Sequence, residues 1–429
     1  MRAFTFKGLF LTAVFMLLGC LTIQAADDDL ITKQITIKLD KAGTLPDRIT
    51  SSKKYKITNL KIIGEINGTD FRMIREMAGS DYYGGSTEGN LSVLDLSEAK
   101  IVIGGGDCFN GYSCYTSNDV IGNRAFSGCS RLTSLTLPAS ITRIGDDAFC
   151  CCSGLTSLTL PAGITEIGYG AFWGCSGLTS LNLPAGITSI GDDAFYGCSG
   201  LTSITLPAGI TEIGGSAFNG CSRLTSLTLP AGITSIGGGA FYGCSGLTSL
   251  NLPAGITEIG GGAFGFCSGL TSINLPAGIT SIGEYAFYGC SGLTSVTLPA
   301  GITEIGECAF YGCSGLTSLT LPAGITTIGE GAFYGCSGLT SLTIPTGVSI
   351  INEYAFYDCS SLTRLDLPSS IREIYYSAFM NCRNLTSLTI PSNVTSISSR
   401  AFSGCSSLKN ITLPTRIFEI GDYAFYGCI

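Results

Sequence analysis

The chain has 429 residues, a net charge of −8 and no histidine. The lack of histidine removes the commonest general base and metal ligand, so we expect a protein that is not an enzyme and holds no cofactor. Between Arg143 and Arg364 the sole basic residue is Arg223, which leaves little to hold a phosphate backbone and argues against a nucleic-acid partner.

Residues 1–25 have the form of an export signal peptide. Basic residues precede an apolar stretch from Leu9 to Leu18, and Ala25 ends a cleavage site of small residues. In a competing interpretation, the segment that ends at Cys20 is a lipobox, and Cys20 carries a lipid anchor. Both interpretations take the protein out of the cytoplasm, to the cell surface, the outer membrane or the medium. We expect no transmembrane helix, because no later stretch is apolar for long enough to span a bilayer.

Residues 26–120 are predicted to form an amino-terminal cap and irregular first coils. This region carries most of the lysines, and its segments 35–39 and 60–66 alternate like half-buried strands. A cap is needed because the end coil of a stack would otherwise expose its core. The alternative is a separate binding domain. Thr69 or Asp70 is expected to cap a short helix over 71–77.

Residues 121–429 repeat every 23 residues. Thirteen of the 14 prolines keep this interval, and so do 14 phenylalanines and 14 of the 20 cysteines. A fixed period of this length predicts a solenoid, in which one coil cannot bury its apolar face alone. We expect an α/β-type solenoid of 23-residue coils, with short strands on its concave face.

Each coil shows why these residues recur, as in the coil that contains Leu158. Leu158 and Leu160 share one face of a strand, while the intervening residues face the other way. Pro161 should end that strand, because proline cannot donate to a ladder that has neighbours on both sides. Ile167 is expected to face inward from a second segment, and Phe172 to fill the core between the layers.

The repeat Leu-x-x-Leu-x-Leu-Pro-x-x-Ile-x-x-Ile-Gly-x-x-Ala-Phe-x-x-Cys resembles the BspA-like leucine-rich repeats of bacterial surface proteins over about 120–429. Residues 56–69 and 94–97 also resemble the leader region of that family. The resemblance implies a right-handed superhelix and an adhesin that binds host matrix proteins, plasma glycoproteins or other bacteria. Two departures stand out: no asparagine ladder follows the strand, and no recognisable sorting domain follows the array.

Two columns of small polar residues on the outward strand face form the candidate concave binding face. Uniform columns favour an extended or repetitive ligand, although small hydroxyls are also ordinary solvated strand residues. The columns comprise Ser157, Thr159, Ser180, Asn182, Ser203, Thr205, Ser226, Thr228, Ser249, Asn251, Ser272 and Asn274, and they continue to Ser341 and Thr343.

The last coils break this uniformity with charged and amide side chains. If one specific patch dominates binding, we expect it at Arg364, Asp366, Arg383 and Asn410, because a specific protein site needs varied chemistry. The alternative is that these coils have simply diverged.

The repeat cysteines, which run from Cys129 to Cys428 at 23-residue intervals, are predicted to be buried free thiols. Stacked identical side chains point the same way, whereas a disulfide needs its Cβ atoms turned toward each other. Metal binding is disfavoured because no Cys-x-x-Cys pair is present. Cys108 and Cys114 are the candidates for a pair. Three further cysteines, Cys150, Cys151 and Cys308, are interpreted as divergence from the repeat.

Other recurring residues have two interpretations each. Tyrosines and Trp173 that follow the repeat phenylalanines are either an aromatic stripe for sugars or protein, or half-buried packing. The acid pairs at 146–147 and 192–193 are either a weak calcium contact or solvated turn residues. Glutamates at 166, 212, 258 and 304 alternate with serines, which indicates that a two-coil unit was duplicated.

These observations predict an exported, non-catalytic surface protein that binds host or bacterial surface proteins or glycans. The principal alternative is a structural spacer that self-assembles through an exposed coil edge and has no specific ligand. Ice binding is disfavoured because curvature and the interrupting asparagines spoil a flat match. A hydrolase is disfavoured because no pairing of a nucleophile with a base is visible.

Overall fold

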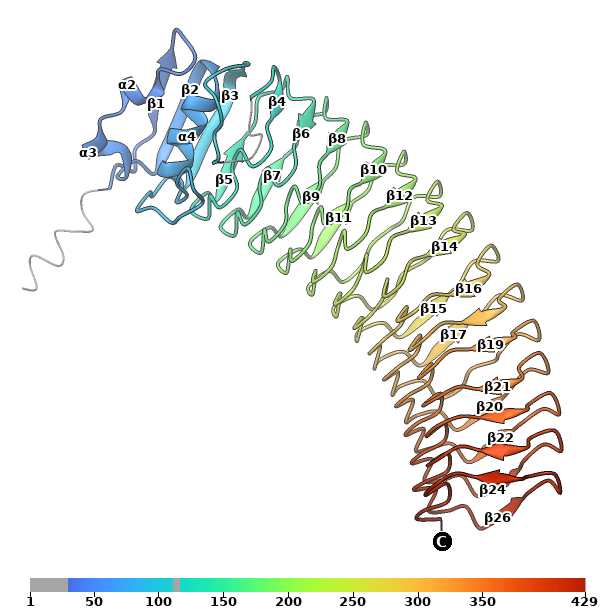
Figure 1. Cartoon of the computed structure of the whole chain (residues 1–429). Coiled ribbons are helices and arrows are strands. Elements are labelled where there is room, and N and C mark those ends of the chain that lie inside the picture. The colour runs from blue at the N-terminus through green and yellow to red at the C-terminus, as the bar shows by residue number, and fades with distance from the viewer. Residues whose placement is uncertain (1–29, 111–115, 429) are drawn as a thin grey trace, which may run out of the picture.

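The computed structural model describes residues 30–110 and 116–428. The predictions for the signal peptide, Cys20 and Cys114 lie outside these residues. The chain forms a stack of coils that bends into an arc, with the described residues nearest each terminus at opposite ends (Figure 1). Among the described residues, no helix combines the length and apolarity needed to cross a membrane.

The amino-terminal part supplies three strands to the sheet that runs into the array. These strands pair in parallel, and the third pairs in turn with the first strand of the regular repeat. The described residues before 102 therefore continue the solenoid, while the domain boundary near 120 stays a prediction. The elements are β1 (Ile35–Leu39), α2 (Leu45–Arg48), α3 (Ser51–Lys54), β2 (Asn59–Ile66), α4 (Gly68–Met77) and β3 (Val93–Ile101).

Helix α4 begins earlier than the sequence suggested, because its N-cap is Asn67 and not Thr69 or Asp70. The side chain of Asn67 accepts from the Thr69 amide at 3.0 Å, and Asp70 accepts from the Asn67 amide at 2.9 Å. Asp70 also accepts from the backbone amides of residues 43 and 45. The buried carboxylate thus closes a capping box and holds the preceding segment, which explains why the prediction was wrong by a few residues.

Arg75, on the inner face of α4, is fully buried and ties the helix to the first regular coil. Its guanidinium donates to the carbonyl oxygen of Arg124 at 2.7 Å and to the hydroxyl of Ser80 at 2.9 Å. The ring of Phe109 lies 4.7 Å from the guanidinium carbon. Burial lowers the pKa of Arg75, although these partners replace part of its lost hydration.

Two columns of short parallel strands run along the array. The first column is β5 (Ser134–Thr136), β7 (Ser157–Thr159), β9 (Ser180–Asn182), β11 (Ser203–Thr205), β15 (Ser272–Asn274), β17 (Ser295–Thr297), β20 (Ser341–Thr343), β22 (Arg364–Asp366), β24 (Ser387–Thr389) and β26 (Asn410–Thr412). The second is β4 (Val120–Ile121), β6 (Arg143–Ile144), β8 (Glu166–Ile167), β10 (Ser189–Ile190), β12 (Glu212–Ile213), β13 (Ser235–Ile236), β14 (Glu258–Ile259), β16 (Ser281–Ile282), β18 (Glu304–Ile305), β19 (Thr327–Ile328), β21 (Ile350–Ile351), β23 (Glu373–Ile374), β25 (Ser396–Ile397) and β27 (Glu419–Ile420).

The strands stack in register, each residue opposite its equivalent 23 residues away. Leu135 lies opposite Leu158, and Ile144 lies opposite Ile167. Leu158 and Leu160 are buried, as is Phe172, which confirms the inward faces predicted from the repeat. Strand β7 ends before Pro161, as expected from the missing amide.

The core is a continuous stack of the repeat phenylalanines. Neighbouring rings lie nearly parallel, with centroids 5.2–5.6 Å apart from Phe126 to Phe425. Their backbone is bonded between coils as well, since the Phe126 amide donates to the Ala148 carbonyl at 2.8 Å. Hydrogen bonds therefore join adjacent coils on this side in addition to the two strand columns.

A ladder of threonine hydroxyl groups lies immediately before the strands of the first column. The hydroxyl of Thr156 donates to the Thr133 carbonyl at 3.2 Å, and that of Thr202 to the Thr179 carbonyl at 3.0 Å. Sequence reasoning missed this role, although a threonine immediately after the first leucine in all but the last coil was the signal for it. The ladder satisfies carbonyl groups at the edge of the strand.

The repeat cysteines are free and mostly fully buried, which confirms the prediction of reduced thiols. They also do more than fill space. The Cys152 Sγ donates to the carbonyl oxygen of Phe126, and thiols from Cys152 to Cys428 make the equivalent bond at 2.9–3.3 Å. Cysteine thus combines a small apolar side chain with a donor that an alanine would lack.

Candidate functional site

The two predicted columns of small polar residues lie on the exposed face of the first strand column. All twelve residues, from Ser157 to Asn274, are exposed, while the leucine or isoleucine between each pair is buried. Their register is direct: Ser180 lies opposite Ser203, and Asn182 lies opposite Thr205. The face therefore presents hydroxyl and amide groups in rows at the spacing of the coils, and its use in binding stays a prediction.

This face is hollowed where the strand ladder opens. Strand β11 has no ladder partner in the following coil, and a hollow of about 440 Å³ lies between residues 203–208 and 226–232. An equivalent hollow of about 450 Å³ lies between residues 295–300 and 318–322. Serine and threonine line both hollows together with apolar residues, namely alanine, proline, leucine and isoleucine or valine. The face is thus a series of depressions of mixed polar and apolar character and not a flat sheet.

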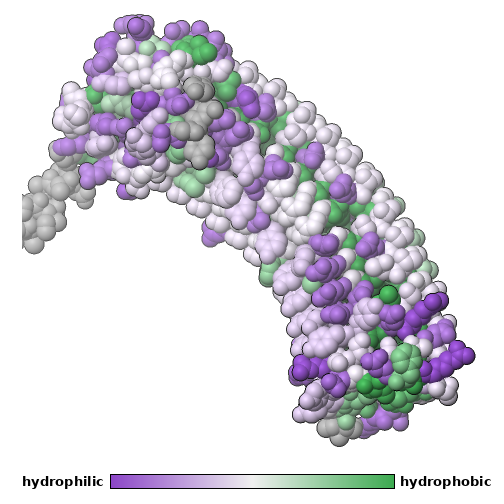
Figure 2. Space-filling view, in the orientation of Figure 1, coloured by the Kyte–Doolittle hydropathy of each residue, from purple (hydrophilic) through white to green (hydrophobic). Residues whose placement is uncertain are grey.

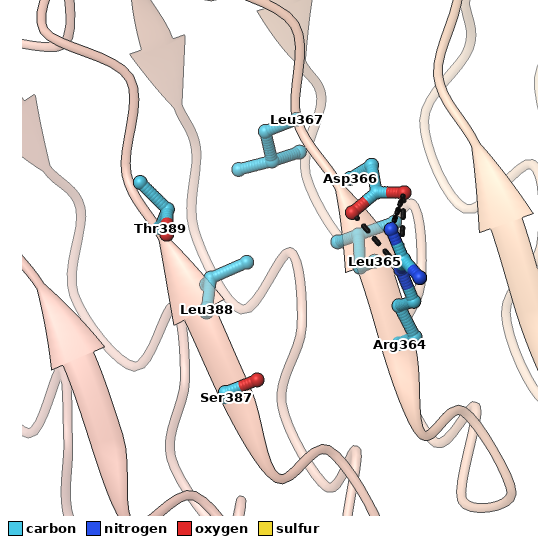
Figure 3. A pocket seen from close by; sticks show the side chains of 7 residues that line it. All are labelled: Arg364, Leu365, Asp366, Leu367, Ser387, Leu388 and Thr389. Atoms are coloured by element: carbon cyan, nitrogen blue, oxygen red, sulfur yellow. Dashed lines mark hydrogen bonds and ion pairs between the residues drawn. The ribbon is translucent and has the colours of Figure 1, made fainter.

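A third hollow separates β22 and β24 and holds part of the predicted specific patch. Arg364 and Asp366 lie on the same face of β22 and point toward one another, with Nη2 and Oδ2 3.1 Å apart, while Ser387 and Thr389 lie on the neighbouring strand β24 (Figure 3). The volume is about 420 Å³. Because the two charges face each other, the hollow presents an ion pair to a ligand and not a single free charge.

The other two members of the predicted patch lie outside this hollow. Asn410 sits on β26, opposite Ser387, and is exposed. Arg383 is also exposed, but it lies in the turn that precedes β24. The structure therefore brings Arg364 and Asp366 together, places Asn410 two strands from them, and leaves Arg383 on the turn.

The aromatic residues that follow the repeat phenylalanines form a second stack. Tyr288, Tyr311, Tyr334 and Tyr357 are half-buried, with ring centroids 4.4–4.7 Å apart. Their ring faces cover one another, so mainly edges and hydroxyl groups face solvent. This arrangement supports the packing interpretation over an open platform on which sugars would stack.

An acidic column runs along the turns before the repeat phenylalanines, and sequence reasoning missed it. Glu284, Glu307, Glu330 and Glu353 occupy the same position in four consecutive coils, and the Tyr285 hydroxyl donates to Glu307 at 2.9 Å. Burial raises the pKa of Glu330, and its two acidic neighbours add to the effect. The recurrence of glutamate at 23-residue intervals was the signal.

In the second strand column, most glutamates lie opposite serines and not opposite other glutamates. Glu212 lies opposite Ser189 on one side and Ser235 on the other. The alternation that suggested a duplicated two-coil unit therefore also separates like charges that would repel on directly opposite strands.

The most hydrophilic surface lies toward the two ends of the arc. Figure 2 shows saturated purple gathered over the amino-terminal part and near the carboxyl-terminal coils, while much of the surface between is pale.

The acid pairs at the turns are engaged with the protein. Asp146 accepts from the Tyr169 amide at 3.0 Å, and Asp192 from the Gly215 amide at 2.6 Å, each in the following coil. Asp147 forms an ion pair with Arg124 at 3.0 Å. These carboxylates join adjacent coils. The interpretation of the acid pairs as simply solvated turn residues was therefore incomplete. In the described parts of the chain, no group of three or more acidic or cysteine side chains could hold a metal.

The cysteines outside the repeat fall into separate environments. Cys108 is disulfide-bonded, and the proposed partner Cys114 lies outside the described residues. Cys150 and Cys308 are half-buried free thiols, and Cys151 is an exposed one. Their positions show that divergence from the repeat placed thiols at the surface of two coils.

Comparisons with known proteins point to one family. The sequence profile of the BspA type leucine rich repeat region matches residues 108–225, 211–339 and 326–429, in six copies. A leucine-rich repeat protein from Bacteroides ovatus is 32% identical, with 74% of this chain and 82% of that one aligned at a TM-score of 0.58. The T. pallidum leucine rich repeat protein is 34% identical over 37% of this chain and 77% of its own, with a TM-score of 0.36. The chain matches no curated protein.

Proposed function

Because this chain belongs to the BspA-type leucine-rich repeat family, we propose that it is an exported, non-catalytic surface protein that binds proteins or glycans of a host or of other bacteria. The apolar segment from Leu9 to Leu18, with its cleavage site near Ala25, supports export. Cys20 is the alternative point of retention, through a lipid.

The exposed face of the first strand column is the observation that carries this proposal. Its rows of hydroxyl and amide groups are interrupted by equivalent hollows of about 440 and 450 Å³ between different coils. A surface that repeats the same weak contacts suits an extended ligand, since affinity then comes from many modest interactions. Neutral hydroxyl groups favour a polar partner, such as a glycan chain or an extended polypeptide.

The test is binding of the chain from residue 26 onward to immobilised matrix proteins, plasma glycoproteins and mucin glycans. Ser203→Lys and Thr228→Lys together place two long cations at one hollow, and we expect them to reduce binding at least tenfold. A matched control variant, Ser189→Lys with Ser235→Lys, adds the same charge to the second strand column, and it should bind like the wild type.

The remaining outcomes separate the alternatives. Equal loss in both variants would mean that added charge and not the hollow governs binding, and the proposed site would be wrong. Binding that survives in both variants would move the site to residues 30–110 or to the hollow beside Arg364. Failure of every immobilised partner to bind, together with concentration-dependent assembly in light scattering, would favour the structural spacer.

A further inference from the structure

One coil carries three adjacent cysteines, and two of them stand outside the repeat. Cys152 is the buried repeat thiol, bonded to the Phe126 carbonyl. Cys150 occupies the position that Trp173 holds in the next coil, and Cys151 the position of Gly174. The two extra thiols therefore replace an aromatic residue and a glycine at the surface, where the fold requires neither sulfur.

The two sulfur atoms of this pair are in contact. The Sγ atoms of Cys150 and Cys151 lie 3.5 Å apart, within contact distance. Cys151 is exposed and Cys150 half-buried, so a reagent meets Cys151 first. The equivalent residues of the adjacent coils are Gly128 and Gly174, which have no side chain to cover that thiol. A small disulfide thus has access from solvent.

We propose that Cys150 and Cys151 form a thiol–disulfide exchange site, which reacts with low-molecular-weight disulfides and closes to a disulfide between the two residues. The Cys151 thiolate attacks one sulfur of the small disulfide, forms a mixed disulfide and releases one thiolate. The Cys150 thiolate then attacks the Cys151 sulfur and releases the second. The pair loses two electrons and two protons, and the small disulfide is reduced to two thiols.

Closure depends on the proximity of Cys150. Burial, and then the neighbouring Cys151 thiol, raise the pKa of Cys150 to about 12, which makes its thiolate scarce at neutral pH. Contact with the target sulfur offsets this scarcity, because an intramolecular nucleophile acts at a very high effective concentration. The Cys151 thiol also stops raising the pKa of Cys150 once its sulfur is bonded in the mixed disulfide. We therefore expect the mixed disulfide to be short-lived and its closure to speed up as pH rises.

The test exposes the folded, reduced chain to oxidised glutathione and follows intact mass and peptide maps. We expect the wild type to lose two alkylatable thiols and about 2 Da, with no lasting adduct. Cys150→Ser should keep a glutathione adduct on Cys151, because no second thiol can displace it. Serine already stands at this position in Ser127 and Ser403, so the variant should fold.

Two further variants keep the outcome interpretable. Cys151→Gly restores the glycine of neighbouring coils and should abolish both the adduct and the closure. Cys308→Ser removes a half-buried thiol in another coil and should react like the wild type. A lasting adduct on wild-type Cys151 would overturn the proposal, and so would two thiols that stay alkylatable while circular dichroism shows a folded chain.

Discussion

At the scale of single residues, the turn before each repeat phenylalanine places one residue in the left-handed region of backbone space. Ser216 has φ 51°, and the equivalent Tyr285 has φ 57°, where a side chain crowds the backbone. Glycine fills the same position at Gly262, with φ 64°. The coil thus tolerates strain that its glycine-containing neighbours avoid.

Ser216→Gly is expected to raise the free energy of unfolding by about 0.5–1 kcal/mol, because glycine adopts positive φ without a steric penalty. Urea denaturation followed by circular dichroism measures the change. The converse variant, Gly262→Ser, should lose a similar amount, since its Cβ would meet no atom closer than 3.9 Å and only the backbone cost remains. A loss in both variants would contradict the argument.

Cys244→Ala is expected to lower the free energy of unfolding by about 1–2 kcal/mol. The substitution leaves a small void and removes the thiol donor to the Phe218 carbonyl, 3.1 Å away. Cys308→Ala is the matched control, because that thiol is half-buried and outside the repeat, and it should change stability by less than about 0.5 kcal/mol. Equal losses would show that the buried hydrogen bond contributes nothing.

At the scale of elements, two threonines of one coil have opposite roles. The Thr202 hydroxyl donates to the preceding coil at 3.0 Å, whereas Thr205 lies on the exposed face of β11. Both threonines are exposed and lie three residues apart, so the sequence alone hardly distinguishes their roles. The inter-coil ladder assigns the structural role to the first and leaves the second available to solvent.

Thr202→Val should therefore destabilise the fold by about 0.5–1 kcal/mol, because valine keeps the branched shape and removes the donor. Thr205→Val, a control with the same chemical change in the same strand region, should be close to neutral. Thermal denaturation of the two variants side by side gives the comparison. Indistinguishable melting temperatures would mean that water replaces the ladder at no cost.

At the scale of the whole molecule, the buried thiols make stability depend on alkaline pH. Burial raises the pKa values of Cys198, Cys244 and Cys290 from 9.0 to about 12. The folded chain keeps these protons where the unfolded chain has lost them. Their contribution to stability is therefore complete below about pH 9 and is lost as pH rises toward 12, at roughly 1.4 kcal/mol per pH unit for each thiol.

The urea midpoint of the wild type is expected to fall steeply between about pH 9 and pH 11. A variant with Cys198, Cys244 and Cys290 changed to alanine starts from lower stability, but its midpoint should fall less steeply with pH because three titrating groups are gone. Comparison of slopes, and not of absolute midpoints, isolates the thiols. Parallel slopes would show that other groups govern alkaline unfolding.

The sequence alone determined the solenoid, the coil length and the inward set of residues. Leucine, isoleucine, phenylalanine and cysteine recur at one interval, and stacking the coils in register is what buries all of them together. The first strands at 35–39 and 60–66 followed from alternation for the same reason. The helix boundary at Asn67 did not, because Asp70, which closes the capping box with Asn67, is held in place by the backbone amides of residues 43 and 45.

Tertiary structure alone decided what depends on the distance between coils. It separated the role of the Thr202 hydroxyl from that of Thr205, and it opened the hollow beside β11. A repeat gives equivalent positions the same letters, but curvature and imperfect strand pairing make their surroundings differ. The period therefore specifies the architecture, while the local spacing of neighbouring coils specifies which side chains are free to act.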